Sequence, residues 1–177
     1  MKPKLLDSRK VFDGRVFSIS EHEIEEEGRR YIREIIDHNG SAVVLPIHSN
    51  GDFELIRQYR HASGDFLIEI PAGTIEPGES PLDCATREVE EETGYRAGSL
   101  SKITEFYVSP GFLSEKMHLF AASDLTKSVQ NTDEDEIIQN FRVSPEEALE
   151  LVHNGGISDA KTMIGILLTQ NAEFTNK

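Results

Sequence analysis

The sequence contains one cysteine, no tryptophan and no apolar run close to the roughly 20 residues that a membrane-spanning helix requires. The lone Cys84 excludes an internal disulfide and a thiolate zinc site, and its place in an expected helix favours a structural thiol. The opening stretch MKPKLLDSRKVFDGR has no continuous apolar segment followed by small residues. We therefore expect no secretory signal and a cytoplasmic location.

Basic residues are also scarce, with 18 lysines and arginines against 32 acidic residues and a formal net charge of −14. This balance argues against broad contact with a nucleic-acid backbone, which requires a basic surface. A small anionic substrate remains compatible with it if bound cations cover the local charge. With 177 residues, 37% of them hydrophobic, the chain can form one main folded core.

Turn signals divide the chain into a small first unit and a larger second one. Asp13-Gly14 and Glu27-Gly28 are typical hairpin connections, so residues 1–39 are predicted to form a small antiparallel β-sheet. Residues 40–177 contain apolar runs of strand length alternating with helical segments. The expected strands are 41–47, 53–59, 66–70, 102–108, 116–122 and 137–143, and the expected later helices are 145–153 and 159–169.

A helix is predicted from about Pro81 to the residue before Gly94. Ser80 is a suitable N-cap, Pro81 fits the first helical position and Asp83 completes a capping-box pattern. Gly94 is a typical C-terminal stop. Both ends of this helix are therefore marked in the sequence.

The same helix carries the sequence REVEEETG, in which Glu88 and Glu92 lie one turn apart. Their repulsion costs about 0.2–0.5 kcal/mol, so we expect a positive group between them. Leu82, Ala85 and Val89 form an apolar stripe beside the glutamates, which places the acidic row at the edge of the core. Carboxylate oxygens are typical ligands of Mg²⁺ in proteins, so the acidic row is a candidate site for this ion. A solvated acidic helix face is the alternative interpretation.

Residues 73–95 read GTIEPGESPLDCATREVEEETGY, and the spacing of this segment is its most specific feature. The segment resembles the Nudix box of hydrolases that act on nucleoside-diphosphate linkages. Its single soft departure is Tyr95, where the pattern has an aliphatic residue. The fixed positions are Gly73, Glu79, Arg87, Glu88, Glu91, Glu92 and Gly94.

The resemblance implies a divalent metal site, with Mg²⁺ as the ion and Mn²⁺ as an alternative. It implies that Glu88 and Glu92 are direct metal ligands, that the backbone carbonyl of Ala72 is another, and that Glu91 is an additional or water-mediated ligand. Arg87 would hold carboxylates in place. An exposed surface ion pair is the alternative role for this arginine.

Elementary chemistry is compatible with these assignments. Gly73 and Gly78 allow a loop that folds back over the start of the helix, which brings Glu79 toward the acidic row. Arg87 can then pair with Glu91 one turn later or with Glu79 across the loop.

Segments outside the box resemble the ADP-ribose pyrophosphatase branch of the family, above all EIPAG at 69–73 and Ser109-Pro110-Gly111 after the box. The alternative interpretation of Ser109-Pro110-Gly111 is an ordinary turn. Arg60 could instead be a charge at the end of a strand, and Arg33 and Glu34 could be exposed strand charges. In the branch, residues like these last two often reach the substrate across a dimer. The implied substrate-binding residues are Arg33, Glu34, Arg60, Gly73, Ser109, Pro110 and Glu115.

An acidic loop, TDEDEII at 132–138, resembles the loop that supplies a catalytic carboxylate in this family. Counting back from Val143-Ser144 assigns Glu136 as a metal ligand and Glu134 as the base, and the exchanged assignment stays open. Geometry has to decide, because a base must reach the attacking water. His61 and His118 fall outside the matched positions, and we expect structural roles for them.

The resemblance covers nearly the whole chain and implies an α/β fold, a Nudix α/β/α sandwich with a mixed central sheet preceded by the small N-terminal antiparallel sheet. It implies a homodimer and magnesium-dependent hydrolysis of ADP-ribose to AMP and ribose 5-phosphate, with no nucleic-acid or membrane partner. Alternatives are another nucleotide sugar, such as an ADP-hexose or GDP-mannose, and a non-catalytic nucleotide-sugar-binding regulator. The regulator predicts a broken set of carboxylates, whereas the set here is intact.

Overall fold

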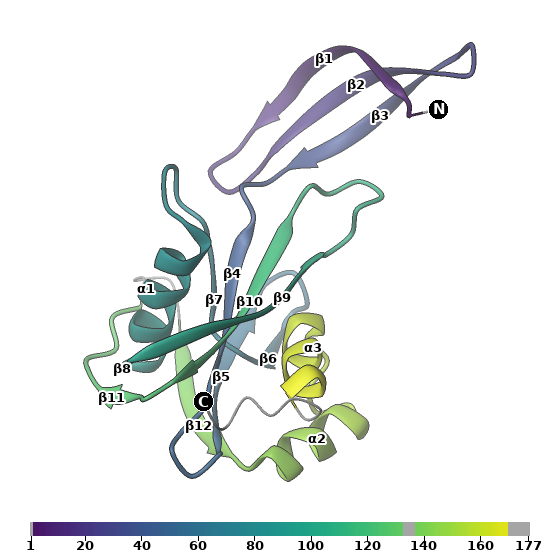
Figure 1. The fold of residues 1–177 in the computed structure, drawn as a ribbon. Coiled ribbons are helices and arrows are strands. Elements are labelled where there is room, and N and C mark those ends of the chain that lie inside the picture. Colours follow the sequence, from purple (N-terminus) through teal and green to yellow (C-terminus); the bar gives the residue numbers. More distant parts are fainter. Residues whose placement is uncertain (1, 133–136, 170–177) are drawn as a thin grey trace.

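A computed structural model describes residues 2–132 and 137–169 of the chain. It has two parts, an N-terminal three-stranded sheet and a larger body of strands and helices from which that sheet projects (Figure 1). Strand β3 leads directly into β4 of the body. In the described residues, no helix combines the length and the apolarity needed to cross a membrane.

The N-terminal sheet consists of β1 (Lys4–Asp13), β2 (Ser18–Glu26) and β3 (Arg29–Asp37), antiparallel and in that order. Its second hairpin closes through Glu27 and Gly28, which have φ angles of 51° and 78°. Two central residues with positive φ match the right-handed twist of the flanking strands. The predicted antiparallel sheet and both of its turns are confirmed.

The central sheet of the body is mixed, as predicted. Strand β4 pairs in parallel with β10 and antiparallel with β7, while β9 pairs antiparallel with β10. Its strands, in spatial order, are β7 (Ala72–Thr74), β4 (Ser41–Pro46), β10 (Lys116–Ser123) and β9 (Ser99–Tyr107).

Two smaller antiparallel sheets complete the strands of the body. In the first, β5 lies between β12 and β6, and in the second, β11 pairs with β8. The strand bounds are β5 (Phe53–Arg60), β6 (Asp65–Glu69), β12 (Ile138–Val143), β8 (Tyr95–Arg96) and β11 (Thr126–Lys127). Each of the six strands expected from the apolar runs is present.

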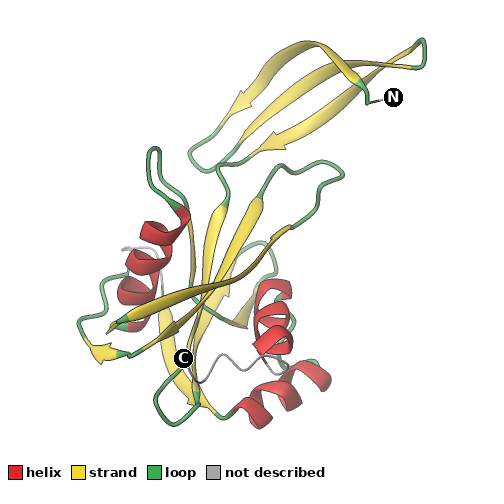
Figure 2. Cartoon of the chain, in the orientation of Figure 1, coloured by secondary structure: helices red, strands yellow, loops and turns green. Residues whose placement is uncertain are grey.

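In the part of the chain that the structure describes, three helices flank these strands: α1 (Pro81–Thr93), α2 (Pro145–His153) and α3 (Ala160–Thr169). Helix α1 covers one side of the central strands, and α2 and α3 cover the other (Figure 2). The predicted sandwich is therefore confirmed. Helix α2 begins with a full capping box between Ser144 and Glu147. At α1, Asp83 instead accepts a hydrogen bond from the Ser80 hydroxyl, which itself accepts from the Asp83 N–H.

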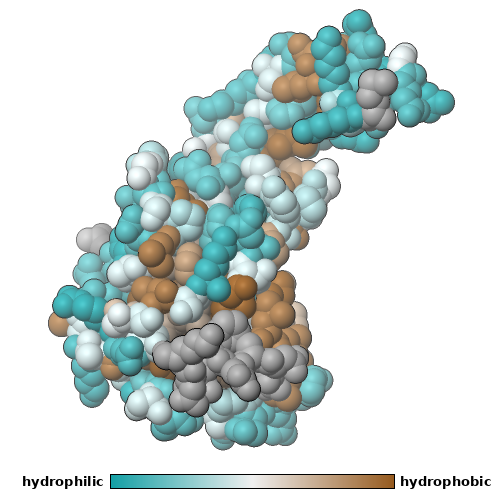
Figure 3. Space-filling model, in the orientation of Figure 1, coloured by the Kyte–Doolittle hydropathy of each residue, from teal (hydrophilic) through white to brown (hydrophobic). Residues whose placement is uncertain are grey.

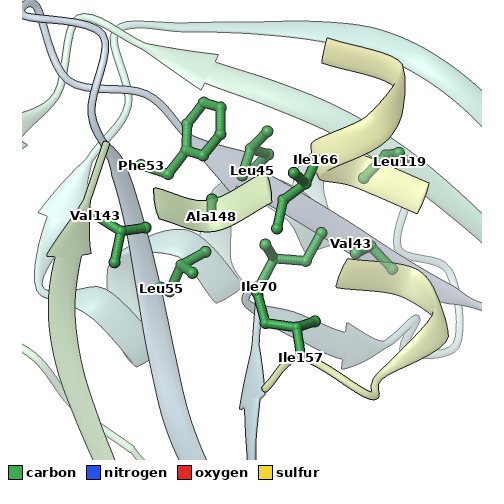
Figure 4. Close-up of a cluster of buried hydrophobic side chains, with 10 residues drawn as sticks. All are labelled: Val43, Leu45, Phe53, Leu55, Ile70, Leu119, Val143, Ala148, Ile157 and Ile166. Carbon is green, nitrogen blue, oxygen red and sulfur yellow. The ribbon is translucent and has the colours of Figure 1, made fainter. Parts of the chain in front are cut away.

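Strand β4 separates two apolar clusters because its side chains alternate between the two faces of the sheet. Val43 and Leu45 pack with the α2 and α3 side, in the cluster drawn in Figure 4. Ala42 and Val44 pack with Val89 on the α1 side. The whole sandwich is thus built around one fully buried strand.

The buried face of α1 differs in one respect from the predicted stripe. Ala85 and Val89 are fully buried, but Leu82 is 47% exposed. The buried positions pair up along the helix at 84–85, 88–89 and 92–93, which leaves Leu82 at the margin of the stripe and in the first turn. Glu88 and Glu92 accordingly lie within the buried face and not merely beside it.

Candidate active site

A cleft of about 680 Å³ lies where β7, the loop after it and α1 meet the turn between β1 and β2. The turn contributes Arg15 and Val16, which were not predicted from the sequence. Neither residue belongs to the matched motif, so only the fold reveals their position. The predicted residues that line this cleft are Arg60, Ala72, Gly73, Arg87, Glu88, Glu91 and Glu92.

Arg87 lies among three glutamates, whereas the positive group expected between Glu88 and Glu92 stays a prediction of a metal ion. Its Nε and Nη2 donate to the two carboxylate oxygens of Glu79 at 3.0 and 3.1 Å. Its Nη1 donates to Glu88 Oε1 at 2.6 Å and to Glu91 Oε2 at 3.0 Å. Both predicted pairings therefore form at once, and these hydrogen bonds hold the pKa of Glu79 below and that of Arg87 above its ordinary value.

Gly73 lies directly against the carboxylate of Glu88. A Cβ atom added at Gly73 would lie 1.6 Å from Glu88 Oε1, closer than any real contact. The absence of a side chain at this position is what allows a buried carboxylate to approach the backbone of β7. Gly78, with φ +87°, forms the turn of the loop, as predicted.

Glu92 is buried, and its Oε2 accepts a hydrogen bond from the Ala72 N–H at 3.0 Å. Within residues 2–132 and 137–169, no three acidic, histidine or cysteine side chains form a group arranged to hold a metal ion. Glu88 and Glu92 still supply the one or two carboxylates that Mg²⁺ takes from proteins, the remaining positions being filled by waters and substrate phosphates. The residues present therefore fit this ion, while the ligand roles themselves, including that of the Ala72 carbonyl, stay predictions.

Cys84 lies on α1 and is fully buried. Its Sγ lies 3.6 Å from the Gly73 carbonyl oxygen and 3.7 Å from that of Thr74. Burial, together with the nearby charges of Glu88 and Glu79, raises the pKa of the thiol to about 12. A thiol that stays protonated is a poor nucleophile, which agrees with the predicted structural role.

Arg60 lies at the end of β5, where its Nε and Nη2 donate to the two oxygens of Glu69, each at 2.8 Å. Glu69 also binds Lys161. Burial acts to raise the pKa of Glu69, but hydrogen bonds from Arg60 and the charge of Lys161 outweigh it, and the pKa lies below its ordinary value. Sequence reasoning missed Glu69 and Lys161, although a glutamate in the apolar strand FLIEI is a signal of a buried ion pair.

The remaining predicted substrate residues do not line this cleft within one chain. Arg33 lies on β3 over the ring of Tyr31, and Glu34 faces Glu21 on β2. Glu115 accepts a hydrogen bond from the Ser41 hydroxyl at 2.6 Å.

Ser109 and Pro110 are part of a turn in which the Ser109 carbonyl accepts hydrogen bonds from the N–H groups of Phe112 and Leu113. The substrate roles of Ser109, Pro110, Glu115, Arg33 and Glu34 stay predictions.

The two histidines with predicted structural roles, His61 and His118, each lie beside another side chain. His61 packs edge-on against Tyr59, and His118 lies on β10 beside Glu105. Partial burial lowers the pKa of His118. Glu134 and Glu136, the predicted base and metal ligand, lie outside the described residues.

A family model described as NUDIX domain matches residues 37–163. The ADP-ribose pyrophosphatase of Bacillus subtilis (strain 168) is 38% identical over 176 residues, covering 98% of this chain and 95% of the relative. The GDP-mannose pyrophosphatase of Yersinia enterocolitica serotype O:8 / biotype 1B (strain NCTC 13174 / 8081) is 37% identical over 153 residues, covering 81% of this chain and 78% of the relative.

A solved structure agrees with these sequence matches. The crystal structure of an ADP compounds hydrolase resembles this fold with a TM-score of 0.86 and 26% identity, and the match covers 96% of this chain and 93% of that chain. The family match begins at the end of β3 and includes α1 with its carboxylates. The chain therefore belongs to the Nudix family.

Proposed function

We propose that this protein is a magnesium-dependent pyrophosphatase that hydrolyses ADP-ribose to AMP and ribose 5-phosphate. The observation that carries the proposal is the placement of Glu88 and Glu92, one turn apart on α1 and both lining one cleft. The similarity to a named ADP-ribose pyrophosphatase along nearly the whole chain supports the choice of substrate.

The reaction adds water across the diphosphate. The water oxygen bonds to one phosphorus, the bond from that phosphorus to the bridging oxygen breaks, and each product keeps one phosphate group. A bound Mg²⁺ would neutralise the diphosphate oxygens and acidify a bound water. Glu88, Glu92 and the Ala72 carbonyl would hold that ion, with Glu136 as a further ligand.

The side chains of this protein have separate tasks in that reaction. Glu134 would take the proton from the attacking water, with the exchanged assignment to Glu136 as the alternative. Asn131 and Thr132, at the end of the described segment, line the cleft. Arg87 orients the carboxylates of Glu88 and Glu91. Catalysis of this kind depends mainly on positioning and on stabilising charge.

The test is product analysis of the purified protein with Mg²⁺ and a panel of ADP-ribose, ADP-glucose, GDP-mannose, a diadenosine polyphosphate and 8-oxo-dGTP. We expect ADP-ribose to be preferred and AMP to be a product. GDP-mannose is the second candidate, because a similar relative carries that name. Binding of one compound without turnover of any would contradict the proposal and favour the regulator.

The N-terminal sheet supports a proposal about assembly. Within β1, β2 and β3, Ser20 is the only buried residue, while Leu5, Phe12 and Ile32 expose about half or more of their surface. Apolar surface is visible on this part of the molecule in Figure 3. We propose that a second copy of the chain covers it, which would bring Arg33 and Glu34 to the partner's cleft.

We expect sedimentation equilibrium to give about twice the 19.8 kDa mass of one chain. Ile32→Glu places a charge on the proposed contact and is expected to produce single chains. Val129→Glu is the matched control, because Val129 is more exposed than Ile32 but lies on the body. A wild-type protein that sediments as one chain would contradict the proposal.

A further inference from the structure

Four charged side chains form a continuous network behind the cleft. Glu69 accepts two hydrogen bonds from Arg60, and Lys161 Nζ also donates to Glu69 Oε2. Lys161 Nζ in turn lies 3.0 Å from Asp159 Oδ2. Glu69 and Lys161 are buried, whereas the side chain of Arg60 is 37% exposed and lines the cleft.

The far end of this network is fixed to the backbone. Asp159 precedes α3 and accepts hydrogen bonds from the N–H and the hydroxyl of Thr162, at 3.0 and 2.6 Å. The same hydroxyl accepts a hydrogen bond from the Ile70 N–H at 2.9 Å. Helix α3 and strand β6, which pack together in Figure 1, are therefore joined at the point where Lys161 meets Glu69.

The charges in the network balance, with two cations and two anions. A buried carboxylate paired with one cation alone would hold that cation strongly, because the interior screens charges weakly. Lys161 satisfies part of the Glu69 carboxylate and fixes its orientation. Arg60 lines the cleft, so Lys161, by satisfying part of the charge of Glu69, strengthens the attraction of the guanidinium for an anion there.

We propose that Lys161 is a positioning residue for the diphosphate of the substrate, acting through Glu69 on Arg60. The inference rests on the proposed function only in requiring that the ligand carries a diphosphate. It assigns to α3, which does not line the cleft, a role in substrate affinity.

Steady-state kinetics of four variants test this role. Lys161→Met is expected to raise KM about tenfold with kcat within about twofold of wild type, since outer partners of a site typically contribute at this level. Lys161→Arg keeps the charge and is expected to restore KM. In an Arg60→Ala background, Lys161→Met is expected to change KM no further, because the residue through which it acts is gone.

An unchanged KM in Lys161→Met overturns the inference. If Lys161→Met raises KM equally with and without Arg60, the inference is also overturned, because Lys161 would then have a merely structural role. Should Lys161→Met not fold, Asp159→Asn tests the inference instead, because it is expected to change KM in the opposite direction. Asn keeps the helix cap and adds one net positive charge, so KM is expected to fall about twofold, and a rise in KM would overturn the inference.

The same measurements separate this inference from the proposed function. If wild type hydrolyses ADP-ribose but Lys161→Met matches it, only the role of Lys161 is wrong. If wild type hydrolyses GDP-mannose instead, the choice of ADP-ribose is wrong and the variants are compared with GDP-mannose. A wild type that hydrolyses neither overturns both.

Discussion

Replacing Glu92 with glutamine is expected to reduce hydrolysis by about a thousandfold or more while the protein stays folded. The side chain is buried and lines the cleft, and the substitution removes a negative charge that would hold the cation that neutralises the diphosphate. The amide oxygen of glutamine can still accept the hydrogen bond from the Ala72 N–H. Steady-state rates with Mg²⁺ and thermal unfolding measure the two effects separately.

Glu90→Gln is the matched control, because Glu90 lies on the same helix but pairs with Arg96 and Ser128 away from the cleft. It is expected to keep wild-type rates. Calorimetric titration with Mn²⁺ adds a readout independent of turnover, in which Glu92→Gln should bind the ion more weakly. Full activity of Glu92→Gln would show that the metal assignment is wrong.

Gly73→Ala is expected to reduce kcat about a hundredfold, since a displacement of about 1 Å in a catalytic group has an effect of that size. The new methyl group would overlap Glu88 Oε1, so the carboxylate has to move. Strand β7 itself tolerates alanine, because the φ angle of Gly73 is not in the left-handed region. Rates and Mn²⁺ affinity should therefore fall together while the unfolding temperature changes less.

A double variant identifies the cause of that loss. If Gly73→Ala acts by displacing Glu88, then adding it to Glu88→Gln should reduce the rate little further. Independent losses that multiply would indicate that Gly73 acts by another route. Wild-type activity in Gly73→Ala would contradict the steric argument altogether.

Local signals explain which parts of this molecule were predictable. Ser80 and Gly94 mark helix α1 in the sequence, and Glu27-Gly28 marks a hairpin, because caps and turns depend on neighbouring residues. The spacing of the box identified the glutamates of the cleft. The simultaneous contacts of Arg87 with Glu79, Glu88 and Glu91 required coordinates.

Features built from distant segments were not predictable in this way. Lys161 and Glu69 are 92 residues apart in the chain, and neither periodicity nor a turn signal links them. Arg15 reaches the cleft only because the first hairpin lies beside β7 and α1. Leu82 fits the helical period of the buried stripe, but its exposure depends on where the packing ends.

The guanidinium of Arg87 also fastens the loop before α1 to the helix itself. Its partners lie in the loop at Glu79 and on the helix at Glu88 and Glu91. A lysine at this position would carry the same charge on a single ammonium group and would lack the planar fork that reaches both oxygens of Glu79. The attachment of the loop therefore depends on the shape of this side chain as well as on its charge.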